Sequence, residues 1–118
     1  DVCSSDLVQS NRAAAVVNLQ QRYGGVCLLK GAGTLIASTD RLSLCPYGNP
    51  GMSVAGMGDL LAGLIGGLAA QGCGLVLATE LGAVVHSLAA DRIVEAQGQR
   101  GLLATDLLPE MRRLINLK

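Results

Sequence analysis

The sequence has 118 residues, half of them hydrophobic, and its nine basic residues balance nine acidic ones. This composition is typical of one globular domain, and the neutral balance argues against a nucleic-acid partner. Four cysteines at positions 3, 27, 45 and 73 form neither a CxxC pair nor a dense disulfide pattern, which favours a reducing, cytoplasmic setting and argues against a cysteine-bound metal.

The first seven residues, DVCSSDL, match one reading frame of a common short-read sequencing adapter. We therefore interpret residues 1–7 as an artefact and residues 8–118 as the folded part. An adapter at this position would mean that the gene began further upstream. We expect residues 8–118 to be the C-terminal part of a single larger domain.

The first half of the chain predicts one helix and three short strands. Residues 11–22 are rich in alanine and end before a Gly-Gly pair, which indicates a helix with a glycine stop. The apolar run 26–29 predicts a buried strand, for which we expect parallel pairing. Two further strands are expected at 35–38 and 42–45, joined by a turn at Thr39-Asp40.

Three helices are expected in the second half. The first follows Asp59 and has an apolar face opposite a side kept slim by Gly63, Gly66 and Gly67, because glycines allow close packing. The second covers residues 75–96, and the third covers 106–116 with a cap at Thr105 or Asp106. In the second helix we expect an apolar inward face and a charged, solvated outward face: Leu81, Val84, Val85 and Leu88 inward, Glu80, Asp91, Arg92 and Glu95 outward.

The uncharged run at 60–79 is 20 residues long, enough to span a bilayer by length alone. A loop signal at residues 71–74, acidic flanks and the lack of an aromatic belt argue against a membrane helix. Strands followed by helices predict an α/β layer fold. Three strands are too few for a complete sheet, so an isolated chain should expose an unpaired edge and an uncovered apolar face.

The stretch 48–63, GNPGMSVAGMGDLLAG, predicts an anion site. Glycines before a helix leave backbone N–H groups accessible, and the helix dipole adds positive charge at the same point. Asp59 would act on the chemistry of the bound anion, or it would only cap the helix or stabilise its first turn. The turn at residues 30–34 is a second candidate for ligand contact, with a simple hairpin as its alternative. The lone His86 is more typical of a structural or surface histidine than of a catalytic one.

Four segments together resemble the C-terminal half of the ADP- or ATP-dependent NAD(P)H-hydrate dehydratase family, whose fold is similar to that of ribokinase-like kinases. These segments are LLKGAGTLI, GNPGMSVAGMGDLLAGLIGGLAAQG, GAVVHSLAAD and GLLATDLLPEMRRL, and the similarity extends over residues 11–118. Ser53 and Ala55 depart from the family, where alanine and glycine are commoner. The resemblance implies a ribokinase-like three-layer sandwich, of which this chain is the C-terminal fragment.

The resemblance also implies a function in metabolite repair. Such a lyase (a hydro-lyase) phosphorylates the S epimer of hydrated NADH or NADPH with ADP or ATP and then eliminates phosphate. Mg²⁺ is expected to bind through the nucleotide phosphates, with no metal held by the protein itself. Family members commonly form homo-oligomers. The alternatives are a ribokinase-like kinase for a small molecule such as a vitamin precursor, and a fragment that binds nucleotide without catalysis.

The resemblance assigns roles to two sets of residues. Asp59 contacts the substrate and accepts its hydroxyl proton. The N–H groups of Gly56, Met57 and Gly58 form the anion hole for the transferred phosphoryl group. The nucleotide-binding residues are those of the glycine-rich turn, together with Gly58: Lys30, Gly31, Ala32, Gly33 and Thr34.

Overall fold

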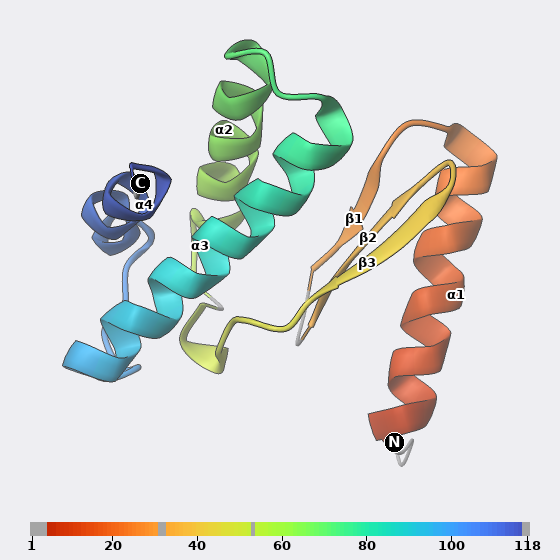
Figure 1. Cartoon of the computed structure of the whole chain (residues 1–118). Helices are drawn as coiled ribbons and strands as arrows, with labels where there is room; N and C mark the ends of the chain where they lie inside the picture. The colour runs from red at the N-terminus through yellow and green to blue at the C-terminus, as the bar shows by residue number, and fades with distance from the viewer. Residues whose placement is uncertain (1–4, 31–32, 53, 117–118) are drawn as a thin grey trace.

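The computed structural model describes residues 5–30, 33–52 and 54–116 of the chain, which form a mixed α/β fold (Figure 1). A helix precedes three strands, and the remaining helices follow them. In chain order the elements are α1 (Ser5–Tyr23), β1 (Cys27–Leu29), β2 (Thr34–Ser38), β3 (Arg41–Cys45), the short 3-10 helix η1 (Pro50–Met52), α2 (Met57–Ala70), α3 (Leu75–Gln97), η2 (Ala104–Leu107) and α4 (Leu108–Ile115).

The three strands form an antiparallel sheet in the order β1-β2-β3. Cys27 lies opposite Ala37 in the first pair, and Thr34 lies opposite Cys45 in the second. The three predicted strands are therefore confirmed, but the parallel pairing expected for 26–29 is wrong. A parallel neighbour needs a crossover of a dozen or more residues, whereas only residues 30–33 connect β1 to β2.

Helices cover both faces of this sheet, with α1 on one side and α3 on the other (Figure 1). Leu35 and Ala37 of β2 pack with Val16 of α1. Ile36, which points to the opposite face, packs with Ala83 of α3. This alternation is what a strand buried on both faces requires.

The face of the sheet toward α1 is only partly covered. Leu42 and Leu44 of β3 lie directly opposite Ala37 and Leu35, so they share that face. Their exposed fractions are 48% and 58%. The predicted uncovered apolar face is therefore present on β3.

Helix α1 ends where the sequence predicts, because the Gly24 N–H donates to the Gln20 carbonyl at 2.7 Å and closes the helix. Its start is different: α1 begins at Ser5, six residues before the predicted start at 11. The proposed artefact origin of residues 1–7 stays a prediction, and residues 1–4 lie outside the described part of the chain.

The helices of the second half pack around a common core. Met57 of α2, Val85 of α3 and Met111 of α4 meet there, together with Leu102 and Leu107 from the connection between α3 and α4. The uncharged run 60–79 is divided, since α2 ends at Ala70 and α3 begins at Leu75. In the described part of the chain, no helix is both long and apolar enough to cross a membrane.

Helix α3 departs in part from its predicted inward face. Leu81, expected to point inward, is 39% exposed, whereas Val85 is buried as predicted and most of the other buried positions hold small residues. Helices α2 and α3 pack tightly at Gly82, where an added Cβ would lie 2.7 Å from Cγ1 of Ile65. By contrast, a Cβ at Gly66 would meet nothing within 4 Å among the described residues, as would one at Gly63 or Gly67. The predicted role of these three glycines in close packing is therefore wrong for this chain.

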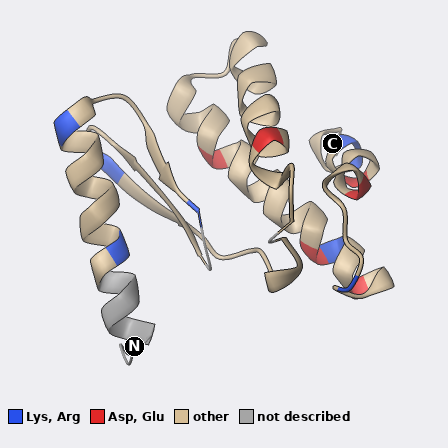
Figure 2. Ribbon diagram, turned by 180° about the vertical axis from the view of Figure 1, so that it is seen from behind, with Lys and Arg blue, Asp and Glu red and all other residues tan. Residues whose placement is uncertain are grey.

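The charged face expected on α3 is confirmed at Arg92 and Glu95, which are exposed, and corrected at Glu80 and Asp91. Glu80 is largely buried, pairs with Arg41 at 2.8 Å and accepts a hydrogen bond from the Ser43 hydroxyl. Asp91 holds a loop, as described below. Figure 2 shows acidic and basic residues occurring together on both α3 and α4.

Helix α4 starts at Leu108, two residues after the predicted start, because the short helix η2 precedes it. Pro109 stands in its first turn, as expected. The predicted cap is wrong: Leu107 is the N-cap of α4, and it makes no side-chain hydrogen bond there. Asp106 instead accepts a hydrogen bond from the Leu103 N–H at 2.9 Å, at the start of η2.

Candidate functional site at the start of helix α2

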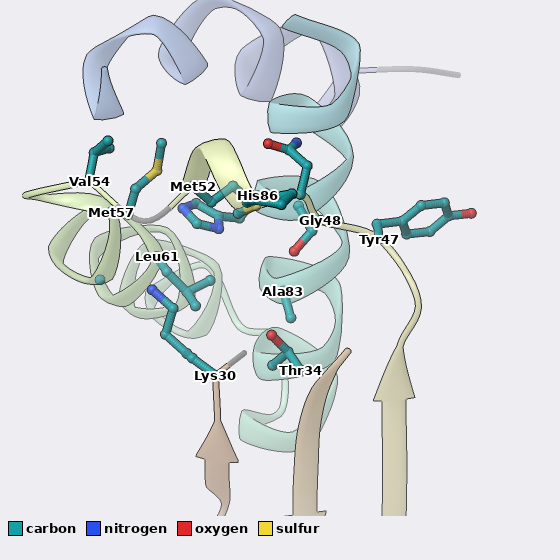
Figure 3. Close-up of a pocket in the computed structure, with 14 residues that line it drawn as sticks. Lys30, Thr34, Tyr47, Gly48, Met52, Val54, Met57, Leu61, Ala83 and His86 are labelled. Atoms are coloured by element: carbon teal, nitrogen blue, oxygen red, sulfur yellow. The ribbon is translucent and has the colours of Figure 1, made fainter. Parts of the chain in front are cut away.

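A cavity of about 780 Å³ lies between the ends of the strands, the start of α2 and the middle of α3 (Figure 3). Three separate parts of the sequence meet there: the β1–β2 turn, the loop 47–58 and α3. The residues that line it are Lys30, Thr34, Tyr47, Gly48, Asn49, Pro50, Met52, Val54, Met57, Gly58, Leu61, Ala83, His86 and Ser87.

One end of the cavity is positively charged. Lys30 follows β1, and its side chain extends toward α2 (Figure 3). An added Cβ at Gly58 would lie 3.7 Å from Lys30 Nζ, so the ammonium group lies against the first turn of α2. N–H groups in a first turn lack intrahelical acceptors, and the helix dipole is positive there. The lysine and the helix start therefore form a place for an anion.

The helix start depends on glycine at position 56. Gly56 is the N-cap of α2 and has φ 88°, a left-handed conformation that an alanine adopts only under strain. All positive φ values in the described residues belong to glycines, so Ala55 is not strained by replacing the commoner glycine. The Met57 N–H, one of the three predicted anion donors, points to the Val54 carbonyl at a long 3.4 Å.

Asp59 occupies the first turn of α2 and is exposed. The N-cap of α2 is Gly56, and no side chain makes a cap hydrogen bond there. Asp59 is therefore not the N-cap, while its position in the first turn still suits the alternative that it stabilises the helix start through the helix dipole. Asp59 follows Gly58 in the sequence but does not line the cavity.

Asp91 of α3 fixes the loop that forms one wall of the cavity. Its Oδ2 accepts a hydrogen bond from the Gly48 N–H at 3.0 Å, and its Oδ1 accepts one from Asn49 Nδ2 at 2.7 Å. Asn49 Oδ1 in turn accepts a hydrogen bond from the Gly51 N–H at 3.0 Å. The carboxylate thus ties residues 48–51 to α3, with a partner 43 positions away in the sequence.

His86 is buried in α3, with 1% of its surface exposed, and it faces the cavity. Its Nε2 has no hydrogen-bond partner among the described residues. Burial, together with the nearby charge of Lys30, lowers the pKa of His86 from 6.5 to about 4, although a hydrogen bond with the Met57 backbone acts in the opposite direction. The imidazole is therefore neutral at pH 7.

The cavity brings together part of each predicted site. Lys30 and Thr34 come from the predicted nucleotide turn, and Met57 and Gly58 come from the predicted anion hole. The turn joins antiparallel strands, so the hairpin reading is also correct. The other predicted residues are outside the lining (Gly33, Gly56 and Asp59) or outside the described residues (Gly31 and Ala32).

Sequence reasoning missed Asn49 and Ser87 in the lining, the anchoring of the loop by Asp91 and the position of His86. The sequence did contain a signal for the burial of His86, because its neighbours in the sequence are small or apolar. Among the described residues, no three His, Cys, Asp or Glu side chains gather as a metal site.

The chain is similar to known proteins over nearly its whole length. The family model described as NAD(P)H-hydrate dehydratase matches residues 2–113. The bifunctional NAD(P)H-hydrate repair enzyme Nnr of Coxiella burnetii is 52% identical over 96% of this chain, which covers 23% of that protein. The ADP-dependent (S)-NAD(P)H-hydrate dehydratase of Neisseria meningitidis is 43% identical over 92% of this chain, which covers 38% of that protein.

A solved structure has the same arrangement of elements. The ADP/ATP-dependent NAD(P)H-hydrate dehydratase of Bacillus subtilis, co-crystallised with ATP and Mg²⁺, superposes with a TM-score of 0.85 at 27% identity. The match covers 93% of this chain and 40% of the Bacillus protein. The chain thus spans less than half the length of the relatives it matches. On the family model and these relatives together, the chain belongs to the NAD(P)H-hydrate dehydratase family.

Proposed function

We propose that this chain supplies the nucleotide and phosphoryl-transfer half of an enzyme that repairs hydrated NADH or NADPH. The observation that carries the proposal is the meeting of Lys30 with Gly58 in one cavity at the start of α2. This arrangement suits the phosphates of ADP or ATP, which need a cation and bare N–H groups. The whole enzyme would have a ribokinase-like three-layer sandwich fold and a cytoplasmic location.

The proposed reaction has two steps. The hydroxyl oxygen of the (6S) hydrate attacks the terminal phosphoryl group of the nucleotide, whose bridging P–O bond breaks and releases AMP from ADP or ADP from ATP, and the Asp59 carboxylate accepts the hydroxyl proton. The N–H groups of Gly56, Met57 and Gly58 stabilise the charge on the moving phosphoryl group. The C–O bond of the phosphorylated hydrate then breaks and the neighbouring proton is lost, which gives inorganic phosphate and the dihydronicotinamide cofactor.

The donor set at this site suits a magnesium ion carried by the nucleotide. Mg²⁺ prefers oxygen ligands and usually binds through substrate phosphates and one or two carboxylates. Asp59 is the acidic residue in the first turn of α2, beside the proposed phosphate position. When bound, the ion would neutralise phosphate charge and help to position the nucleotide. The chain would contribute Lys30 and the start of α2 to hold those phosphates.

The test of this function uses a chimera, because the chain spans 38% of the Neisseria dehydratase. Residues 8–118 replace the matching segment of that protein, and loss of hydrated NADPH is followed by absorbance with ADP, with ATP and without nucleotide. We expect turnover that requires a nucleotide and releases one phosphate per cofactor restored. A stable phosphorylated product without elimination would favour the kinase alternative, and nucleotide-independent turnover would refute the proposal.

A further inference from the structure

His86 has an unused hydrogen-bonding atom facing the candidate nucleotide cavity. Only 1% of the surface of His86 is exposed, yet Nε2 has no hydrogen-bond partner among the described residues. A buried polar atom left without a partner costs roughly 1–3 kcal/mol. Such an atom in a cavity wall therefore points to a ligand group that satisfies it. In Figure 3 the imidazole projects from α3 toward the start of α2.

The protonation state of the ring determines what Nε2 can bind. His86 is neutral at pH 7, so one ring nitrogen carries a proton and the other has a free lone pair. A hydrogen bond between the ring and the Met57 backbone raises the pKa of His86. A bond that favours the protonated ring is one in which a ring N–H donates, so the acceptor is the Met57 carbonyl. Since Nε2 is unpaired, Nδ1 is the donor. Nε2 is then a pure acceptor.

An acceptor cannot face a phosphate, because two lone pairs would repel each other. The phosphate belongs beside Lys30 Nζ, which lies against Gly58, and Nε2 is left for a group that donates a hydrogen bond. The surroundings of the ring are largely apolar, with Met52, Met57 and Leu61 among the lining residues. This part of the cavity suits an uncharged portion of a ligand that carries an N–H or O–H donor.

We propose that Nε2 of His86 binds the nucleotide by accepting a hydrogen bond from an uncharged donor, either an amino group of the base or a hydroxyl of the sugar. The inference rests on the proposed function, because it takes the cavity as the nucleotide site. His86 is then a nucleotide-binding residue that selects for the nucleoside portion, while Lys30 and the start of α2 hold the anionic portion.

The lone histidine of the chain makes this contact directly observable. The chain is labelled with ¹⁵N, and its ring nitrogens and backbone amides are followed by NMR at pH 7 during titration with ADP and magnesium. We expect the Nε2 signal to move toward the hydrogen-bonded position while the amide of Gly58 shifts. Pyrophosphate, which lacks the nucleoside, should shift the Gly58 amide and leave Nε2 in place.

Analogues identify the donor. Loss of the Nε2 shift with inosine diphosphate assigns the base amino group, and loss with 2′-deoxy- or 3′-deoxy-ADP assigns a sugar hydroxyl. His86→Leu, which removes the acceptor, should weaken ADP binding about tenfold in calorimetry while leaving pyrophosphate binding unchanged. His86→Gln retains a side-chain acceptor and should recover part of the affinity.

Three results would overturn the inference, and they differ in what they say of the proposed function. If ADP shifts the Gly58 amide but not Nε2, or if pyrophosphate moves Nε2 as much as ADP does, His86 does not contact the nucleoside and the proposed function stands. If saturating ADP moves neither signal, the cavity holds no nucleotide, and the assignment of His86 and the nucleotide role proposed for this chain fail together.

Discussion

Replacing Asp91 by asparagine should loosen the loop that forms the cavity wall. The Asp91 carboxylate accepts hydrogen bonds from the Gly48 N–H at 3.0 Å and from Asn49 Nδ2 at 2.7 Å. Asparagine keeps one acceptor oxygen and turns an NH₂ group toward the other donor. One bond is therefore lost and replaced by a contact between two donors, while the charge that strengthened both is removed.

The magnitude follows from these two bonds. A hydrogen bond to a charged group contributes about 1.5–3 kcal/mol, but the Gly48 bond is exposed and is weakened by solvent. We therefore expect Asp91→Asn to lower the free energy of unfolding by roughly 1–2 kcal/mol. The assay is urea unfolding followed by circular dichroism at pH 7. ADP affinity should fall as well, because Gly48 and Asn49 line the cavity.

Glu95→Gln is the matched control, since it removes the same charge from an exposed position on the same helix. Its unfolding midpoint and its ADP affinity should stay close to those of the unmodified chain. Equal midpoints for Asp91→Asn and Glu95→Gln would refute the reasoning, because the two bonds would then contribute nothing beyond general charge.

Three further predictions concern stability and association. The pKa of His86 is about 4 in the folded chain and 6.5 when unfolded, so the unfolded state binds the proton first as the pH falls. The contribution of His86 to the free energy of unfolding should be full above pH 6.5 and decrease by roughly 3 kcal/mol on going to pH 4. Urea unfolding should show no such decrease in His86→Gln. Gly82→Ala should destabilise the chain by about 1–2 kcal/mol because the new Cβ meets a neighbour at 2.7 Å, whereas Gly66→Ala, with open space, should stabilise it by up to about 1 kcal/mol in the same experiment. The double change Leu42→Ser and Leu44→Ser should reduce self-association in sedimentation velocity, because both side chains are exposed on one sheet face; unchanged association would show that this face is not the contact.

The sequence was sufficient to locate the elements whose signals are local. Glycine patterns determine where α1 ends and where α2 begins, so the stretch around Gly56 and Gly58 could be recognised as a helix start and as a candidate for anion binding. The short apolar strand 26–29 was found for the same reason. Whether this strand pairs parallel or antiparallel could not be predicted, because a continuous apolar run fits both kinds of neighbour equally.

The rest of the site depends on contacts between residues far apart in the chain. Asp91 and Glu80 have the spacing of a solvated helix face, and only their partners 43 and 37 positions away reveal their roles. Gly82, rather than the glycines of α2, permits close packing, because the position of Ile65 on the facing helix decides which glycine is needed. Local periodicity does not contain this information.

The most direct test of the proposed mechanism is the turnover of Asp59→Asn in the chimera that carries residues 8–118. Asparagine has nearly the same shape but cannot accept the hydroxyl proton, so we predict a fall in turnover of about a hundredfold or more with nucleotide affinity little changed. Asp40→Asn, in the exposed turn between β2 and β3, is the control and should turn over like the unmodified chimera. Unchanged turnover in Asp59→Asn would contradict the assignment of this carboxylate as the base.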